Sequence, residues 1–377
     1  MSYAQQKQYK ISTDLKDITE YILLKESDIQ AIFLVGSFGR NEGSVLDLEG
    51  KLMIVNDYDL VLISKKKRSQ KSIDQLRREL ELNTKIRQID ISFYTKKELR
   101  RLKFSMYSYD LKYASKLLWG SKECLNLVPR MNAEDMPLIE AVRPLLLFPV
   151  SLLQAYPKEE MSPTDLFWSY QQITKSIFGW ASALLILNNK YDPSYKKRYI
   201  IFKEIYKDFP ELCVLLEKAV SFKLDPVFDP IDIENYYDFW RKCSDVHIDI
   251  LIKVLQKYLH IRSSKIENIL AAYKKTPVNI IKKFLSLLPG IDKGTMISFE
   301  VGQALLCKSL LYENSSSERI KYKRLALNEA SRIPYFEGYN FLKKRKIDID
   351  DRELINFFIS TNPNSKSWYL KGNKLIY

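Results

Sequence analysis

The sequence predicts an α+β fold in which a small mixed sheet with helices comes first and an all-helical part follows. Strand-like and helix-like patterns alternate as α, β, turn, β, α, β up to about residue 130, and the pattern is helical after that point. The length of 377 residues is more than one hydrophobic core usually organises. We therefore expect three domains, over residues 1–130, 131–262 and 263–377.

Hydrophobic spacing predicts the elements of the first domain. Apolar side chains recur every three or four residues at Ile11, Leu15, Ile18 and Ile22, which is typical of a helix with one buried face. Each expected strand is a short apolar run bounded by turn residues. In chain order, we expect a helix over 11–26, a buried strand over 31–37, a hairpin over 44–55, a strand over 57–64, a helix over 72–85, a strand over 88–95, and a helix from 96 that gives way to a short strand ending at Gly120.

The rest of the chain reads as helices. Residues 162–189 predict a long helix, with Ser162 suited to the N-cap and Pro163 to the first helical position. Its aromatic and aliphatic side chains fit one broad buried face, and we interpret them as core. Further helices are expected over 194–209, 210–222 and 233–259, and a helical pattern continues through 263–377. We expect residues 131–262 to form a helical bundle.

The charge of the chain points to an acidic partner. The formal net charge is +14 and the pI is near 9.3, which favours nucleic acid, a nucleotide or an acidic membrane surface. The alternative is a general richness in lysine, because the lysines are spread along the chain and form no long basic tail. The basic segments SYKKRY (194–199) and FLKKRK (341–346) are the ones we expect to face a polyanion.

Cysteine usage and hydropathy predict a cytoplasmic protein. The four cysteines lie far apart and form no C-x-x-C pair, and with two histidines a zinc site is not expected. The N-terminus has no apolar signal core. The richest apolar stretch, residues 137–156, is interrupted by Glu140, Arg143 and two prolines, so it is not expected to cross a membrane.

Two aspartates open the strand over 57–64. Because side chains alternate along a strand, Asp57 and Asp59 are expected on the same face. Two carboxylates at such a short distance repel each other unless a cation lies between them. Mg²⁺, a hard ion that prefers oxygen ligands, is the cation expected there. Asp90 comes from the next apolar strand, where an acid also needs a partner. Three carboxylates from two strands suggest a metal site suited to in-line phosphoryl transfer.

A glycine-serine turn ends the strand over 31–37. Gly36 and Ser37 would expose backbone N–H groups and a hydroxyl that can bind phosphate oxygens, and a glycine lets a ligand approach the backbone closely. Arg40 could add a charge-assisted contact to the same phosphates.

These residues resemble the signature of the DNA polymerase beta-like nucleotidyltransferase superfamily. The resemblance is carried by Gly36-Ser37, Asp57-x-Asp59 and Asp90. It implies that the glycine-serine turn holds a nucleoside triphosphate, that the paired aspartates bind Mg²⁺, and that the third acid shares the metal site. It therefore implies a polymerase beta-like domain at the N-terminus.

The resemblance covers about residues 10–125, including the text GSFGRNEG and the SKLLWG that ends at Gly120. One departure is the spacing of nineteen residues between Ser37 and Asp57, longer than usual in the family; a projecting hairpin at Glu49-Gly50 would account for it. The alternative for the aspartates is a solvated strand end with turn residues at Asn56-Asp57.

The helical part resembles the substrate-binding partner of aminoglycoside nucleotidyltransferases and the bundle called HEPN. In similar two-domain transferases a lysine in a Tyr-x-Pro-x-x-Lys setting reaches the triphosphate, and Lys196 would match it; a solvated basic turn is the alternative. Arg241 and His247 resemble the Arg-x4-6-His motif of ribonuclease-active HEPN bundles, although a lone helical histidine is more often a packed or surface residue.

The sequence thus predicts an Mg²⁺-dependent nucleotidyltransferase that moves a nucleoside monophosphate from a triphosphate to an acceptor hydroxyl. The charge favours RNA, tRNA included, over a small molecule or a protein as acceptor. The expected site residues are Asp57, Asp59 and Asp90 for catalysis and metal binding, and Gly36, Ser37, Arg40 and Lys196 for nucleotide binding. Two alternatives stay open: a HEPN-type ribonuclease or toxin-antitoxin-like module regulated by the transferase domain, and a non-catalytic interaction protein.

Overall fold

The chain forms two compact units in a computed structural model that describes residues 2–48, 50–86, 89–226, 235–279, 294–313, 316–333 and 350–361. The sheet unit comprises Met1–Pro137 and Asn188–Phe228, and the helical unit comprises Leu138–Leu187 and Asp229–Tyr377. This division differs from the expected boundaries at 130 and 262, because 188–228 packs with the N-terminal part of the chain.

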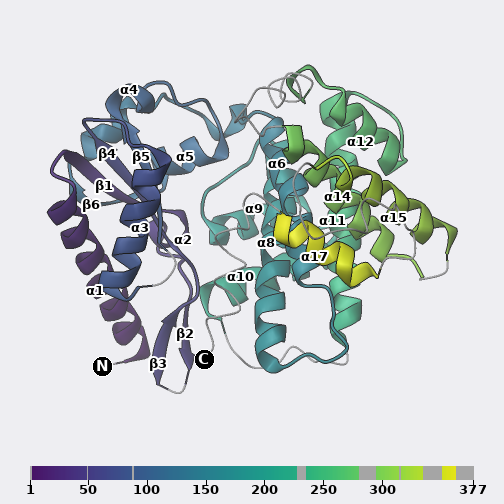
Figure 1. Cartoon of the computed structure of the whole chain (residues 1–377), viewed down its shortest axis with the longest axis horizontal. Helices are drawn as coiled ribbons and strands as arrows, with labels where there is room; N and C mark the ends of the chain where they lie inside the picture. Colours follow the sequence, from purple (N-terminus) through teal and green to yellow (C-terminus); the bar gives the residue numbers. More distant parts are fainter. Residues whose placement is uncertain are drawn as a thin grey trace. The chain divides into compact units, whose positions relative to one another are not determined.

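The sheet unit contains a four-stranded mixed sheet, which confirms the α+β class (Figure 1). The strand order is β5-β4-β1-β6, with β4 parallel to β5 and antiparallel pairing elsewhere. The expected hairpin forms a separate two-stranded sheet. The strands are β1 (Ile29–Val35), β2 (Val45–Leu48), β3 (Lys51–Ile54), β4 (Tyr58–Ser64), β5 (Ile89–Thr95) and β6 (Lys116–Gly120).

Two hydrophobic cores cover the two faces of the four-stranded sheet. On one face, Leu60 and Leu62 of β4 pack with side chains of α1 (Tyr3–Lys25) and α3 (Gln70–Thr84). On the other face, Val61 and Ile63 pack with Leu111 and with residues that follow β6. Because side chains alternate along β4, Asp59 belongs to the face of Val61 and Ile63.

The segment after β5 contains two short helices in place of the single helix that the sequence predicts. They are α4 (Lys96–Leu99) and α5 (Met106–Tyr113). Thr95 and Ser105 each act as an N-cap whose side chain accepts a hydrogen bond from the backbone three residues on. Each cap starts a new helix, which explains the break between them.

The remaining helices of the sheet unit come from the segment that the sequence assigns to the bundle. They are α9 (Tyr195–Ile205) and α10 (Pro210–Leu224), and α2 (Gly36–Gly39) is a single turn after β1. Short 3-10 helices η1 (Lys122–Leu127) and η2 (Ala133–Asp135) follow β6.

The helical unit is built around the long helix predicted at 162–189. In it α8 packs against α6 and α11, and Trp180 and Trp240 are fully buried. None of the helices in the described ranges is long and apolar enough to cross a membrane. The described helices are α6 (Ile139–Leu147), α7 (Pro149–Gln154), α8 (Pro163–Leu187), α11 (Tyr236–Leu259), α12 (Ile266–Lys274), α14 (Gly294–Leu310), α15 (Ser317–Ala330) and α17 (Asp351–Thr361).

Candidate active site

Two of the predicted carboxylates lie side by side on the sheet. Asp59 of β4 is the register partner of Asp90 in the parallel strand β5. Directly paired residues of neighbouring strands project from the same face, so both carboxylates lie on the face of Val61 and Ile63. On the other side of β4, Asp59 pairs with Val35, the last residue before the glycine-serine turn.

Gly36 makes room for the Asp59 carboxylate. Its φ is +63°, in the left-handed region that favours glycine, and a Cβ placed there would lie 2.0 Å from Asp59 Oδ2. No side chain other than hydrogen fits that distance. Gly36 was predicted to let a ligand approach the backbone closely. In the structure, the group that approaches it closely is the Asp59 carboxylate of the neighbouring strand.

A cavity of about 450 Å³ opens at this pair. Its wall includes Gly36, Asp59 and Asp90, together with Arg77 from α3 and Tyr107 from α5. Arg77 Nη1 lies 3.9 Å from Asp90 Oδ1 and forms an ion pair with it. The cavity, which we call the carboxylate cavity, has the size of a small-molecule site and belongs to the sheet unit alone.

In the carboxylate cavity, the charged form of Asp59 is destabilised relative to its protonated form. Burial, and then the neighbouring carboxylate of Asp90, raise the pKa of Asp59 to about 7. Arg40 and Lys223 lower it in part. A carboxyl in this state is poised to accept either a proton or a cation, and perturbed carboxyls in cavities are typical of functional sites.

Asp57 lies one residue before β4 and is buried, with 8% of its surface exposed. Its charge acts on the ammonium of Lys223, a residue of α10. Lys223 Nζ donates a hydrogen bond to Asn56 Oδ1 at 2.5 Å. Burial lowers the pKa of Lys223 to about 8; a nearby guanidinium adds to the shift and carboxylates, Asp59 among them, oppose it. The half-buried ammonium of Lys223 thus interacts with the charges of Asp57, which precedes β4, and of Asp59 within it.

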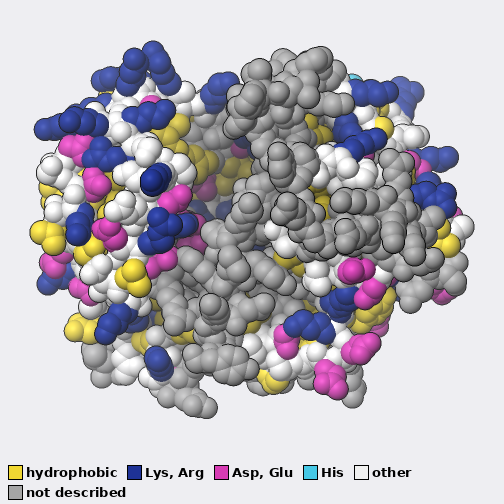
Figure 2. Space-filling model, in the orientation of Figure 1, with side chains coloured by type: hydrophobic (Ala, Val, Ile, Leu, Met, Phe, Trp, Pro, Cys, Tyr) yellow, Lys and Arg dark blue, Asp and Glu magenta, His cyan; other side chains and the backbone are white. Residues whose placement is uncertain are grey.

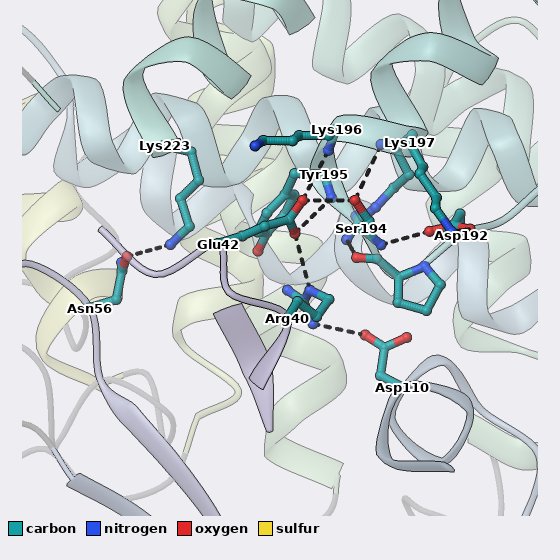
Figure 3. A network of polar contacts seen from close by, with 12 residues as sticks. Arg40, Glu42, Asn56, Asp110, Asp192, Ser194, Tyr195, Lys196, Lys197 and Lys223 are labelled. Carbon is teal, nitrogen blue, oxygen red and sulfur yellow. Dashed lines mark hydrogen bonds and ion pairs between the residues drawn. The ribbon is translucent and has the colours of Figure 1, made fainter. Parts of the chain in front are cut away.

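Arg40 is held between two carboxylates (Figure 3). Its guanidinium pairs with Glu42 and with Asp110, each at 3.4 Å, and lies 5.0 Å from the centre of the Tyr195 ring. Asp110 also accepts a hydrogen bond from the Tyr191 hydroxyl at 3.0 Å. These contacts hold Arg40 against Asp110, which lines the carboxylate cavity.

Glu42 caps α9 from outside that helix. Its carboxylate accepts hydrogen bonds from the Ser194 hydroxyl at 2.7 Å and from the backbone N–H groups of Tyr195 at 3.0 Å and Lys196 at 3.1 Å (Figure 3). The first N–H groups of a helix lack partners within the helix, and a carboxylate there is favourable. Glu42 therefore fixes α9 to the turn that follows β1.

We expect Glu42→Ala to lower the free energy of unfolding by about 2 to 4 kcal/mol. Three part-buried donors of α9 would lose their acceptor, and Arg40 would lose one of its two carboxylate partners. Glu42→Gln keeps one carbonyl oxygen and should lose less. Urea denaturation measures both, and Glu204→Ala, an exposed acid on α9, is the control with an expected change near zero. An alanine variant as stable as the wild type would show that the cap is not needed.

The remaining predicted nucleotide-binding residues differ in exposure. Ser37 is buried, and its carbonyl accepts a hydrogen bond from Glu42 N–H at 2.8 Å. The side chain of Lys196 is exposed, and its backbone N–H is the group that contacts Glu42. The basic segment 341–346 lies outside the described residues.

The three predicted metal ligands do not form one tight cluster. Within the ranges that the structure describes, no three His, Cys, Asp or Glu side chains lie close enough together to hold a metal ion. Asp59 and Asp90 are paired, whereas Asp57 lies beside Lys223. A site with three protein carboxylates stays a prediction.

The two residues of the predicted ribonuclease pair, Arg241 and His247, differ in their exposure to solvent. His247 is fully buried in the helical unit, where its ring nitrogens contact the Ser176 hydroxyl at 2.7 Å and the Leu145 carbonyl at 2.8 Å. Burial lowers its pKa to about 4. Arg241 is exposed on the same helix. The contacts of His247 are those of a packed histidine.

Sequence reasoning missed four polar residues of this site: Glu42, Asn56, Asp110 and Lys223. Glu42 lies in the text GSFGRNEG but was assigned no role, and Lys223 and Asp110 are distant in sequence from the aspartates. Asn56 was considered only as a turn residue beside Asp57, without a hydrogen-bonding role. The others required the packing of α9 and α10 on the sheet unit.

Comparisons with protein-family models, with curated proteins and with solved structures find no match to this chain. The function is therefore inferred from the geometry and chemistry of the site.

Proposed function

We propose that the protein is an Mg²⁺-dependent nucleotidyltransferase of the polymerase beta-like kind, transferring a nucleoside monophosphate from a nucleoside triphosphate to an acceptor hydroxyl. The proposal rests on one observation, the pairing of Asp59 with Asp90 in the wall of a cavity beside the glycine-serine turn. Because Gly36 has no Cβ, the Asp59 carboxylate can lie against this turn. The combination places carboxylates next to a turn suited to phosphates.

The donor set fits magnesium. Mg²⁺ prefers oxygen ligands and is usually held by one or two carboxylates, with substrate phosphates and water completing its shell. Asp59 and Asp90 would supply these ligands, with Asp57 as a third candidate. The raised pKa of Asp59, caused by burial and by Asp90, is what a cation would relieve. Bound Mg²⁺ would stabilise charge on the transferred phosphoryl group.

The chain's own residues have separate tasks. The N–H groups of the turn at Gly36-Ser37 would bind phosphate oxygens. Lys223 would offset their charge beside Asp57. Arg40, held by Glu42 and Asp110, would keep the turn and α9 in place and contribute positive charge. Asp90, with 45% of its side chain exposed and Arg77 as its ion-pair partner, would either complete the metal's shell or accept the proton of the acceptor hydroxyl.

The direct test incubates the purified protein with each α-labelled nucleoside triphosphate, Mg²⁺ and either cellular RNA or a small-molecule extract. Labelled product identifies the nucleotide and the acceptor class, whether RNA, tRNA or a small molecule. No labelled product with any triphosphate and acceptor fraction would contradict the proposal, provided that the protein is folded by circular dichroism.

Lys223 and Lys196 are competing candidates for the triphosphate contact, and we expect Lys223 to matter more. Lys223→Met should raise the KM for triphosphate by about tenfold or more, because a charge-assisted hydrogen bond is lost. Lys196→Met is the matched variant, with an exposed side chain in the wild type and an expected change below about twofold. Steady-state kinetics measure both, and the reverse order would return the role to Lys196.

A further inference from the structure

Eight exposed cations form a surface at one edge of the sheet, which we call the basic edge. It has two segments, one after β4 and one that includes α4. The residues are Lys65, Lys66, Lys67, Lys96, Lys97, Arg100, Arg101 and Lys103. The tracts that contain them, 65–68 and 96–103, hold nine Lys or Arg and a single acid, Glu98. These twelve residues account for more than half of the net charge of the chain.

The two segments are brought together by the parallel strand pair. Ser64 and Thr95, the last residues of β4 and β5, are register partners, so the chain leaves both strands at the same edge. Figure 2 shows Lys and Arg side chains gathered over the part of the molecule where Figure 1 draws α4. Buried Leu99 anchors this helix in the core of the sheet unit.

The one acid of the basic edge is used to build the helix. Glu98 accepts a hydrogen bond from Thr95 N–H at 2.9 Å, and Thr95 Oγ1 accepts one from Glu98 N–H at 3.2 Å. Within the described ranges, Lys67 is the member of the basic edge that forms an ion pair, with Glu98 at 3.6 Å. The surface therefore keeps a high positive charge that internal pairing does not cancel.

A single face of β5 connects the basic edge with the carboxylate cavity. Asp90, Ser92 and Tyr94 alternate with apolar residues and lie on one face, and Lys96 follows them. Six residues of extended chain span about 20 Å. Beside this face, Tyr107 keeps 41% of its surface exposed, its ring centre lies 6.4 Å from that of Tyr94, and its hydroxyl interacts with Ser92 and Tyr94.

We propose that the basic edge binds the phosphodiester backbone of single-stranded nucleic acid. A row of cations beside the exposed ring of Tyr107 and the half-buried ring of Tyr94 suits such strands, since cations follow the phosphates and an aromatic ring can stack with a base. An acidic membrane fits less well, because none of the large exposed apolar side chains of the sheet unit lies in 65–68 or 96–103 of the described chain. The inference does not depend on nucleotidyl transfer.

The test measures binding of fluorescent single-stranded RNA and DNA of one sequence, without Mg²⁺ or triphosphate, across a salt series. Three charges are removed from the basic edge in Lys66→Gln/Arg100→Gln/Arg101→Gln. The matched control is Lys203→Gln/Lys207→Gln/Lys218→Gln, which removes three exposed charges from α9, α10 and the turn between them in the same unit. Thermal melting checks that both variants are folded.

We expect the edge variant to bind at least about tenfold more weakly at low salt and to lower the slope of log affinity against log salt by about two, since single strands contribute about 0.7 per phosphate contact. The control should stay within about twofold of the wild type. Tyr107→Leu should weaken binding by about fivefold or more without changing the slope, because it removes stacking and no charge.

Equal loss in the edge and control variants would overturn the proposal, since the binding would then follow total charge. An edge variant that binds oligonucleotides like the wild type but loses binding to phosphatidylserine vesicles would assign the surface to membranes instead. Binding of RNA and DNA alike supports a backbone-reading surface, and a preference for RNA supports one that also contacts the 2′-hydroxyl. Nucleic-acid binding without labelled transfer product would keep this inference and remove the proposed function.

Discussion

Replacing Asp59 by Asn is expected to lower nucleotidyl transfer by on the order of a thousandfold, while the fold is retained. Asparagine keeps the size of the side chain and its fit against Gly36, so the packing of the turn should survive. It removes the charge that would hold the metal ion. The measurement is the rate of labelled product formation at saturating triphosphate and Mg²⁺.

The same variant is expected to be more stable than the wild type at pH 8 when no metal is present. The folded-state pKa of Asp59 is about 7, above its usual value of 3.8, because of burial and then of Asp90. The folded protein therefore binds the proton more tightly than the unfolded chain, and the wild type should lose stability as the pH rises from about 4 to 7. The asparagine side chain has no proton to lose, so the variant should gain roughly 1 to 4 kcal/mol over the wild type above pH 7.

Urea denaturation in the presence of EDTA between pH 4 and pH 8 tests whether the wild type loses stability relative to the variant as the pH rises. Asp17→Asn, an exposed acid on α1, is the control and should follow the wild type. Asp57→Asn should also abolish transfer, because Asp57 is one of the proposed ligands. Full activity of Asp59→Asn would contradict the proposed role of this carboxylate, and unfolding of the variant would show that the residue is structural.

Replacing Gly36 by Ala is expected to destabilise the sheet unit by about 2 kcal/mol or more and to reduce transfer to background. Two costs add. The left-handed φ of +63° is unfavourable for alanine, and the new Cβ would lie 2.0 Å from Asp59 Oδ2, so the carboxylate must move. Thermal or urea unfolding gives the stability, and the transfer assay gives the activity.

Gly50→Ala separates these two costs. Gly50 also has a positive φ, +84°, but a Cβ placed there meets nothing within 4 Å. This control should lose about 1 kcal/mol from the backbone conformation alone. The combination Gly36→Ala/Asp59→Ala should be more stable than the sum of its parts predicts, because truncating Asp59 relieves the collision. Equal losses at Gly36 and Gly50 would mean that the contact with Asp59 carries no cost.

Local pattern was enough to predict the strands, whereas the shared face was predicted for Asp57 and Asp59, and the structure pairs Asp59 with Asp90. The alternation around Asp59 and Asp90 follows from a side-chain period of two, and the apolar runs that contain them form β4 and β5. The hairpin at Gly50 and the short strand ending at Gly120 were predicted from turn residues in the same way. These features depend on neighbours in sequence.

Features that depend on distant packing could not be predicted. A helical pattern at 194–222 predicts which residues form helices. It does not predict that Glu42 caps α9 or that the half-buried Lys223 interacts with Asp57. The break between α4 and α5 was missed because the apolar spacing continues through it, while the caps at Thr95 and Ser105 set the boundary. Lys196 was predicted to contact the triphosphate from the spacing of the Tyr-x-Pro-x-x-Lys pattern alone, which says nothing about where its side chain lies.

The sheet unit is discontinuous in sequence, and this affects the order in which the chain can fold. A ribosome that has released residue 137 has made every strand of the sheet, but not α9 and α10. Residues 138–187 are synthesised before α9 and α10. At about 5 to 20 residues per second, the time between the synthesis of residue 137 and that of residue 228 is on the order of 10 s. During this interval Arg40, Glu42 and Asp110 lack their partners from 188–228. A fragment that stops at residue 137 would remain in that incomplete state, so a minimal version of this unit has to carry 188–228 as well, joined by a linker in place of 138–187.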